Sequence, residues 1–137
     1  MRTTVIAAVV SLIFSIVLAG CSSAGPASTQ KEIAKQRSGD YVVTLLNDTG
    51  QLKQGENAYT LEFRKASDNS LVDVGPVTAT TQMPMPGMSN MVGDTVVTQS
   101  GTAGRYNVKT SFGMKGSWTA SFTYGDNQKV QLSLKAQ

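Results

Sequence analysis

The sequence predicts an all-β fold, a seven-stranded antiparallel β-sandwich of immunoglobulin-like architecture that follows a signal peptide and a flexible tether. Three observations lead to this prediction. From residue 39 onward apolar and polar residues alternate, which is typical of half-buried strands. Clusters of Gly, Asn, Asp and Ser separate the alternating runs, as turns do. The runs are short and closely spaced, which favours a sandwich.

Seven segments within residues 39–137 show this alternation. In the second segment, Tyr59, Leu61 and Phe63 alternate with polar residues. We expect Trp118 and the aromatic residues of the fifth and sixth strands to supply much of the core. The predicted strands are 41–45, 59–64, 77–81, 95–99, 106–112, 118–124 and 129–134, and residues 71–74 offer a further short edge strand.

The first 21 residues have the layout of an export signal. Arg2 precedes an almost unbroken apolar run over residues 5–18, which is shorter than the roughly 20 residues of a membrane span. The run ends in Leu-Ala-Gly-Cys, which resembles the lipobox of bacterial lipoproteins, whose cysteine becomes the lipid-modified first residue. We therefore predict a lipoprotein signal peptide over residues 1–20 and lipidation of Cys21. The alternative is an ordinary signal peptide with a coincidental cysteine.

Residues 21–38 are predicted to be a lipidated tether. Their first part, Ser-Ser-Ala-Gly-Pro-Ala-Ser, is linker-like in composition. Thr29 and Glu32 have the spacing of a capping box, so two helical turns over residues 30–37 are the alternative to a flexible coil. Serine follows Cys21, a pattern that in Gram-negative bacteria resembles that of outer-membrane lipoproteins facing the periplasm.

The charge distribution argues against a nucleic-acid partner. The formal net charge of +3 arises entirely within residues 1–38, while residues 39–137 contain eight basic and eight acidic side chains. Binding to nucleic acid requires a clustered basic face, which a neutral domain gives no reason to expect.

Methionines are concentrated in one predicted loop, between the third and fourth strands. Four of the six in the chain lie within nine residues there, and two prolines and a glycine accompany them. Prolines reduce the entropy lost when such a loop is ordered. The four methionines are Met83, Met85, Met88 and Met91.

The order of the strands places a fifth methionine near this loop. If successive strands run antiparallel, the connections alternate between the two ends of the sandwich. The loop over residues 83–92 then shares an end with the loop over 113–115, which contains Met114. The five methionines of the mature chain would gather at this end, and the tether would enter from the opposite one.

Thioether sulfurs are soft ligands that favour Cu(I) and, by extension, Ag(I). The chain has no histidine, so a mixed His/Met copper site is not available. Two other interpretations stay open. Methionine fills irregular apolar gaps, and Met83 continues the inward phase of the third strand. In the second of these interpretations, the loop is a contact surface for a partner protein. Met88 and Met91 are the best placed for ligation, because no predicted strand includes them. The candidate ligands are Met83, Met85, Met88, Met91 and Met114.

The sequence does not predict an enzyme. It has no histidine, its only cysteine is the candidate for lipidation, and it contains no nucleophile-elbow motif. General acid–base catalysis usually requires histidine or a perturbed carboxylate. We therefore assign no catalytic or cofactor-binding residues.

Several segments between residues 39 and 135 resemble the YtkA-like/FixH-like domain. They include Gly39-Asp40-Tyr41, residues 52–57 before the second strand, and residues 68–74. Met83-Pro84 through Met88 matches an "MP-x-x-x-M" loop. The most specific block, G-x-Y…F-x-M-x-G-x-W, matches Gly104, Tyr106, Phe112, Met114, Gly116 and Trp118.

This resemblance implies a small extracytoplasmic β-sandwich, often lipid-anchored, that is sometimes joined to heavy-metal efflux adaptors or linked to oxidase maturation. Many members have histidines in the methionine loop, and this chain has none. We therefore expect a lipid-anchored protein of the cell envelope that handles Cu(I) or Ag(I) as an accessory to metal efflux or delivery. The alternative is an accessory lipoprotein that binds no metal and docks onto an envelope protein complex.

Overall fold

The computed structural model describes residues 29–137, and every regular element in that range is a strand. An all-β antiparallel fold is thus confirmed, but it has eight strands where seven were predicted. Cys21 and the predicted signal peptide lie outside the described residues. The strands are β1 (Lys31–Ser38), β2 (Tyr41–Asn47), β3 (Gly55–Lys65), β4 (Val77–Met83), β5 (Met91–Gln99), β6 (Arg105–Phe112), β7 (Gly116–Tyr124) and β8 (Gln128–Ala136).

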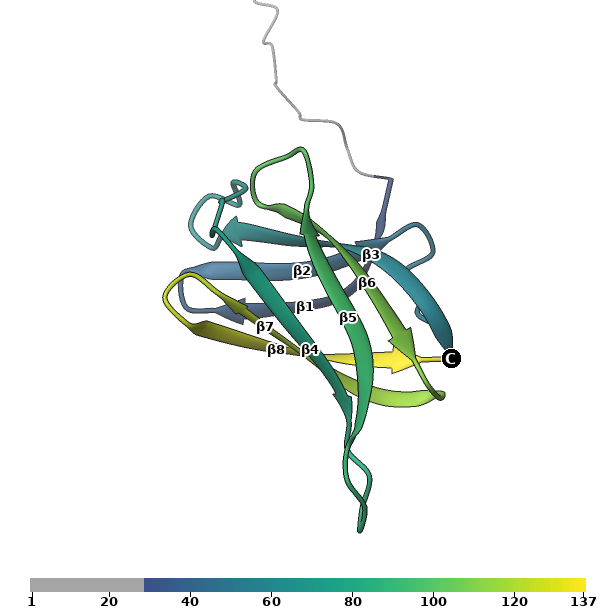
Figure 1. The fold of residues 1–137 in the computed structure, drawn as a ribbon. Helices are drawn as coiled ribbons and strands as arrows, with labels where there is room; N and C mark the ends of the chain where they lie inside the picture. The colour runs from purple at the N-terminus through teal and green to yellow at the C-terminus, as the bar shows by residue number, and fades with distance from the viewer. Residues whose placement is uncertain (1–28) are drawn as a thin grey trace, which may run out of the picture.

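The strands form two packed layers in the order β1-β2-β3-β6-β5-β4-β7-β8 (Figure 1). Strand β5 belongs to both layers, because Met91–Gly93 pairs with β4 while Asp94–Gln99 pairs with β6. A Cβ on Gly93 would lie 2.8 Å from the carbonyl oxygen of Ser111. Glycine therefore permits the close approach of backbones at which β5 passes from one layer to the other.

The predicted aromatic core is confirmed. Trp118 is buried against Phe112, with their ring centroids 5.1 Å apart, and Phe63 contacts Tyr124 at 4.8 Å. These side chains come from β3, β6 and β7, so the alternation that predicted the strands also predicted which face of each strand packs inward.

A chain of hydroxyl groups crosses the core where β5 changes layers. The hydroxyls of Thr81 and Thr95 are 2.7 Å apart, Thr110 donates to Thr95 over 3.3 Å, and the Tyr59 hydroxyl lies 3.0 Å from that of Thr110. Burial raises the pKa of Tyr59 to about 12, an effect that the Thr110 hydrogen bond partly offsets. The chain gives each buried hydroxyl a partner, as buried polar groups require.

Residues 31–38 are strand β1, so the predictions of a coil or a short helix were wrong for this segment. β1 pairs antiparallel with β2, and Ile33 and Ala34 pack against the core. An isolated helix of two turns is marginal in water, whereas pairing with β2 satisfies the same backbone groups. A bulge between Glu32 and Ala34 interrupts the alternation. That interruption is why the period-two pattern did not reveal the strand.

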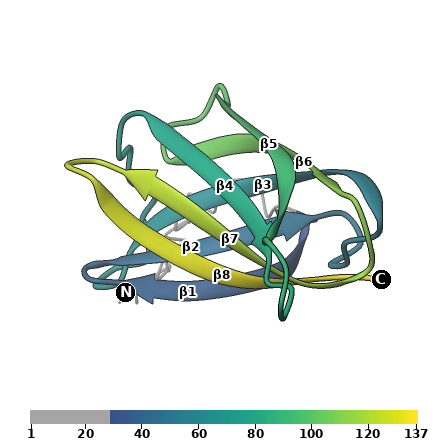
Figure 2. The same cartoon turned by 60° about the horizontal axis from the view of Figure 1, so that its bottom comes forward.

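The last strand, β8, lies beside β1, the first (Figures 1 and 2). The Tyr124 hydroxyl at the β7–β8 turn donates to Ser38 Oγ at the end of β1 over 2.9 Å. The two edge strands therefore cover one another, and the sandwich is closed along this side.

The extra strand changes where the chain enters the sandwich. Lys31 lies beside Gly50, and the loop that follows Gly50 contacts Gly113 through a 3.0 Å hydrogen bond from Gln54 Nε2, so β1 starts at the same end of the sheet as the β6–β7 loop. The predicted entry opposite the methionines is therefore wrong for the β6–β7 loop, because the prediction counted one strand too few. Thr29 nevertheless shares a surface depression with residues of the β5–β6 loop. Figure 1 shows β1 beginning on the side of the body away from the tip of the β4–β5 hairpin.

Candidate functional site

The β4–β5 hairpin extends beyond the sandwich and contains four methionines (Figure 1). Met83 ends β4, Met91 begins β5, and the two residues are partners in the antiparallel register. Between them the chain turns with Gly87 at φ 75°, and Met88 N donates to Met85 O over 3.1 Å. The left-handed conformation at position 87 is one that glycine adopts without strain.

The β6–β7 loop, residues 113–115, packs against the base of this hairpin. The Met91 sulfur lies 3.1 Å from the position that a Cβ on Gly113 would occupy. The Met83 sulfur lies 3.9 Å from the equivalent position on Gly116, and the Met83 methyl group would clash with a side chain there. Because Gly113 and Gly116 have no side chains, they leave room for the two thioethers.

Met114 is held at the same place by the core tryptophan. Trp118 Nε1 donates to the Met114 carbonyl oxygen over 3.1 Å, which fixes the loop backbone above the aromatic core. The structure therefore brings Met83, Met91 and the backbone of Met114 together. The predicted proximity of the two loops is confirmed.

The five methionines differ in exposure. Met83 is 8% exposed and belongs to the core, as its strand phase indicated, whereas Met114 is 36% and Met88 67% exposed. Met85 is partly buried on the hairpin. Met91 was predicted to lie outside any strand, but it begins β5 and packs against the core. The sequence did not show that the Met91 side chain points inward, because the predicted fourth strand began four residues later.

The described residues offer little else for binding a metal. Within residues 29–137 no three His, Cys, Asp or Glu side chains form a group that could hold an ion. Cys21, the predicted lipidation site, falls outside this range. No helix long and apolar enough to cross a membrane occurs within it either.

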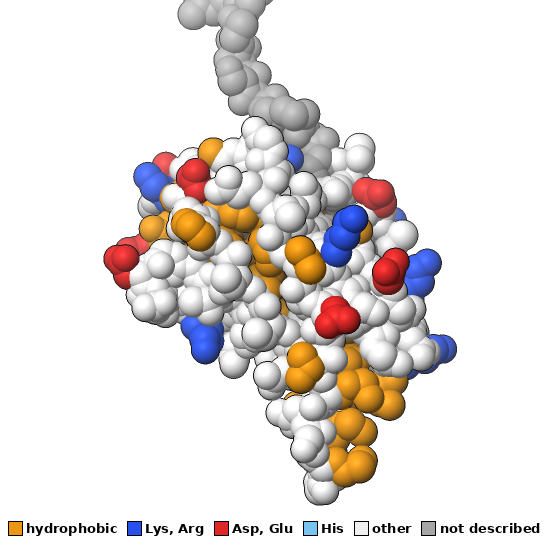
Figure 3. All heavy atoms as spheres, in the orientation of Figure 1, with side chains coloured by type: hydrophobic (Ala, Val, Ile, Leu, Met, Phe, Trp, Pro, Cys, Tyr) orange, Lys and Arg blue, Asp and Glu red, His pale blue; other side chains and the backbone are white. Residues whose placement is uncertain are grey.

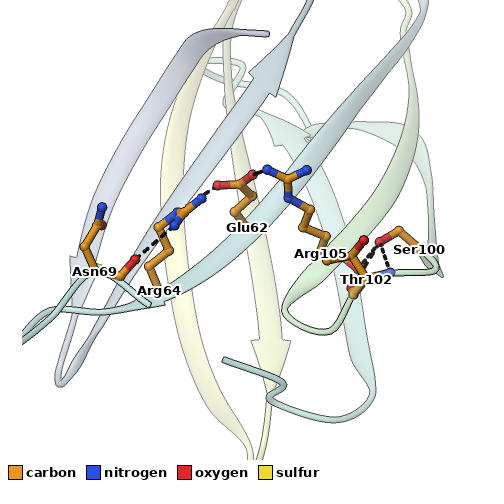
Figure 4. Close-up of polar contacts among 6 residues, drawn as sticks. All are labelled: Glu62, Arg64, Asn69, Ser100, Thr102 and Arg105. Atoms are coloured by element: carbon orange, nitrogen blue, oxygen red, sulfur yellow. Dashed lines mark hydrogen bonds and ion pairs between the residues drawn. The ribbon is translucent and has the colours of Figure 1, made fainter. Parts of the chain in front are cut away.

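A buried ionic cluster lies on the outer face of β3 and was not predicted from the sequence. Glu62 is 2% exposed and lies 3.0 Å from Arg64 Nε and 2.6 Å from Arg105 Nη2 (Figure 4). Arg64 also donates to the Asn69 carbonyl oxygen over 2.9 Å. Alternation placed Glu62 on the solvent side, and nothing local in the sequence showed that two arginines would cover it.

The cluster has the geometry of a structural element. It links β3 to β6 and to the β3–β4 connection, and the Ser100 hydroxyl donates to the Arg105 carbonyl oxygen over 2.9 Å in the adjoining loop. Glu62 Oε1 forms the ion pair with Arg105 Nη2 but makes no hydrogen bond with a favourable angle, and Arg105 Nε has no hydrogen-bond partner among the described residues.

Comparison with known proteins identifies the family. Among solved structures, the crystal structure of the Lin-41 filamin domain is similar, with a TM-score of 0.45 and 13% identity, over 64% of this chain and 81% of that one. A search of curated proteins finds no match. The model of the YtkA-like family matches residues 35–123, most of the chain, and the protein therefore belongs to the YtkA-like family.

Proposed function

We propose that this protein is an extracytoplasmic lipoprotein that binds Cu(I) or Ag(I) at its methionine-rich end and acts as an accessory to metal efflux or delivery. The observation that carries the proposal is the packing of the Met83 and Met91 side chains against the loop that contains Met114. These residues are distant in sequence, and a site built from them depends on the fold.

The chemistry of the donors selects the ion. Thioethers are neutral, soft ligands that suit Cu(I) and Ag(I) better than hard divalent cations. Methionine sulfur does not titrate, so such a site keeps its ligands at mildly acidic pH. The absence of histidine from the chain removes the donor that Cu(II) sites usually contain.

The differences in exposure suggest a division of roles. Met83 and Met91 are fixed by strand pairing and supply pre-positioned sulfurs, and Met114 approaches from the neighbouring loop. Met85 and Met88 lie further out on the hairpin and make the first contact with an incoming ion. In this scheme the ion passes from the exposed tip to the base.

The location and the absence of catalysis belong to the same proposal. Lipidation of Cys21 anchors the protein in a bacterial membrane, facing the periplasm from the outer membrane if the cell is Gram-negative. The FixH-like part of the resemblance favours a role beside a metal-handling complex. The protein carries its ion without an enzymatic step and without a nucleic-acid partner.

A Cu(I) competition titration tests the proposal. The fragment 22–137 contains all eight described strands and is suitable for it. Replacing every methionine by norleucine keeps side-chain length and removes the sulfur. We expect the natural fragment to take Cu(I) from a chromophoric chelator and the norleucine form, folded by circular dichroism, to fail. Equal competition by the two forms rules out a thioether site.

A second function is favoured by the apolar character of the hairpin. Met88 and Val92 are each 67% exposed, and Figure 3 shows hydrophobic side chains along one side of the protruding tip. This surface would let the protein dock onto an envelope complex without binding metal. Crosslinking of the anchored protein in cells tests it. Met88→Asp with Val92→Asp should remove the partner, and an unchanged set of crosslinks contradicts docking through the hairpin.

A further inference from the structure

The adjacency of β1 and β8 gathers basic side chains from the two ends of the described chain. Arg37 and Lys129 border one groove between these strands. At the other end of the strands, Lys31 lies beside Gly50, and Ala136 bridges to Leu52 two residues further on. The side chains that follow this line are called the basic seam, and they are Lys31, Lys35, Arg37, Lys129 and Lys135.

The seam differs in charge from the remainder of the domain. β1 and β8 contain five basic side chains and one acidic, Glu32, which lies 3.3 Å from Lys35. The other described residues contain six basic and eight acidic side chains. The near-neutral total thus conceals a positive strip on one side of a weakly negative body.

The seam is long and polar. All five of its basic residues are exposed. Six residue steps separate Lys129 from Lys135, which corresponds to about 20 Å along a strand. The neighbouring outward residues of β8, Gln131 and Ser133, are uncharged and exposed. Charges spaced along a strip suit an extended anionic surface better than a compact ligand.

We propose that the basic seam lies against an anionic phospholipid membrane. The negative potential of such a surface attracts lysine and arginine side chains. A basic patch is also the usual second membrane contact of a protein that has a single lipid anchor. Cys21, the residue proposed to bear the lipid, precedes Lys31 by ten residues, which can span at most about 35 Å. The anchor therefore keeps the seam within reach of the bilayer. The inference does not depend on metal binding.

Vesicle sedimentation of fragment 22–137, which has no lipid, tests the seam alone. The fragment should bind vesicles containing phosphatidylglycerol, should not bind vesicles of phosphatidylcholine alone, and should be released by salt. In the seam variant, Lys129 and Lys135 are each changed to Gln. Its binding should weaken about 25-fold, since each charge near the surface contributes about fivefold.

A matched variant with Lys65 and Lys109 changed to Gln has the same net charge and an intact seam. It should bind within about threefold of the natural fragment, since its changes lie outside the region of strong potential. Both variants are checked for unaltered thermal unfolding. Equal loss in the two variants, equal binding to neutral vesicles, or binding to soluble polyphosphate without binding to anionic vesicles overturns the proposal.

Discussion

Met83 and Met91 are cross-strand partners at the base of the β4–β5 hairpin, and each rests on a position that only glycine can occupy without displacing it. This relationship joins two strands and the β6–β7 loop at one place. It makes the proposed metal site testable residue by residue.

Single substitutions should separate the base of the hairpin from its tip. Met→Leu changes preserve apolar volume and remove one sulfur. We expect Met91→Leu and Met114→Leu each to weaken Cu(I) binding about tenfold or more, because each removes a soft ligand. Met88→Leu, at the exposed tip, should change the equilibrium affinity less than threefold, about 0.6 kcal/mol. Competition titration measures all three, and the reverse order of effects would move the site to the tip.

Gly93→Ala should destabilise the fold. Its Cβ would lie 2.8 Å from the Ser111 carbonyl oxygen, a backbone atom that cannot move aside cheaply. We expect a loss of about 1–3 kcal/mol in the free energy of unfolding, measured with urea. Gly101→Ala is the matched control, because a Cβ there meets nothing within 4 Å. A loss in the control as large as that at position 93 would contradict the steric explanation.

Glu62→Gln tests the buried ionic cluster. The substitution keeps the shape of the side chain and leaves Arg64 and Arg105 without their shared counter-charge. Because both arginines are partly exposed, we expect a loss of about 2 kcal/mol, below the value for a fully buried pair. Glu56→Gln, an exposed change on the same strand, should be nearly neutral in the same unfolding experiment. Equal stability of the two variants would mean that the cluster adds nothing.

Tyr59 should make stability fall at alkaline pH. Burial raises its pKa in the fold to about 12, from the ordinary tyrosine value of 10.0. The unfolded chain therefore loses this proton first, so stability falls as pH rises above 10.0 and levels off above about 12. A difference of two units corresponds to about 2–3 kcal/mol. Tyr59→Phe removes this contribution. The difference in the free energy of unfolding between the two proteins should therefore shrink as the pH rises between these values. A difference that stays constant over this pH range would contradict the prediction.

Much of the fold was predictable because most strands bury one face only. Alternation over β3, β6, β7 and β8 revealed both the strands and their inward residues, including Trp118. β1 was missed because its bulge breaks the alternation. Its pairing depends on β2 and β8, and local sequence does not describe either contact.

The candidate site was predictable in part for similar reasons. Antiparallel order correctly brought residues 113–115 to the methionine hairpin. The packing of Met91 was not predictable, because it depends on where β5 begins. The burial of Glu62 depends on Arg105, which is 43 positions away in the chain and reaches it only through the pairing of β3 with β6.

The apposition of β1 and β8 also bears on when the molecule can fold. Strand β1 can pack against β8 only after residues 128–136 have been made, so the sandwich cannot close on a chain that lacks them. Contacts between such distant residues slow folding. A nascent polypeptide that stays open until residues 128–136 emerge can still pass unfolded through a translocation channel, which the proposed export requires.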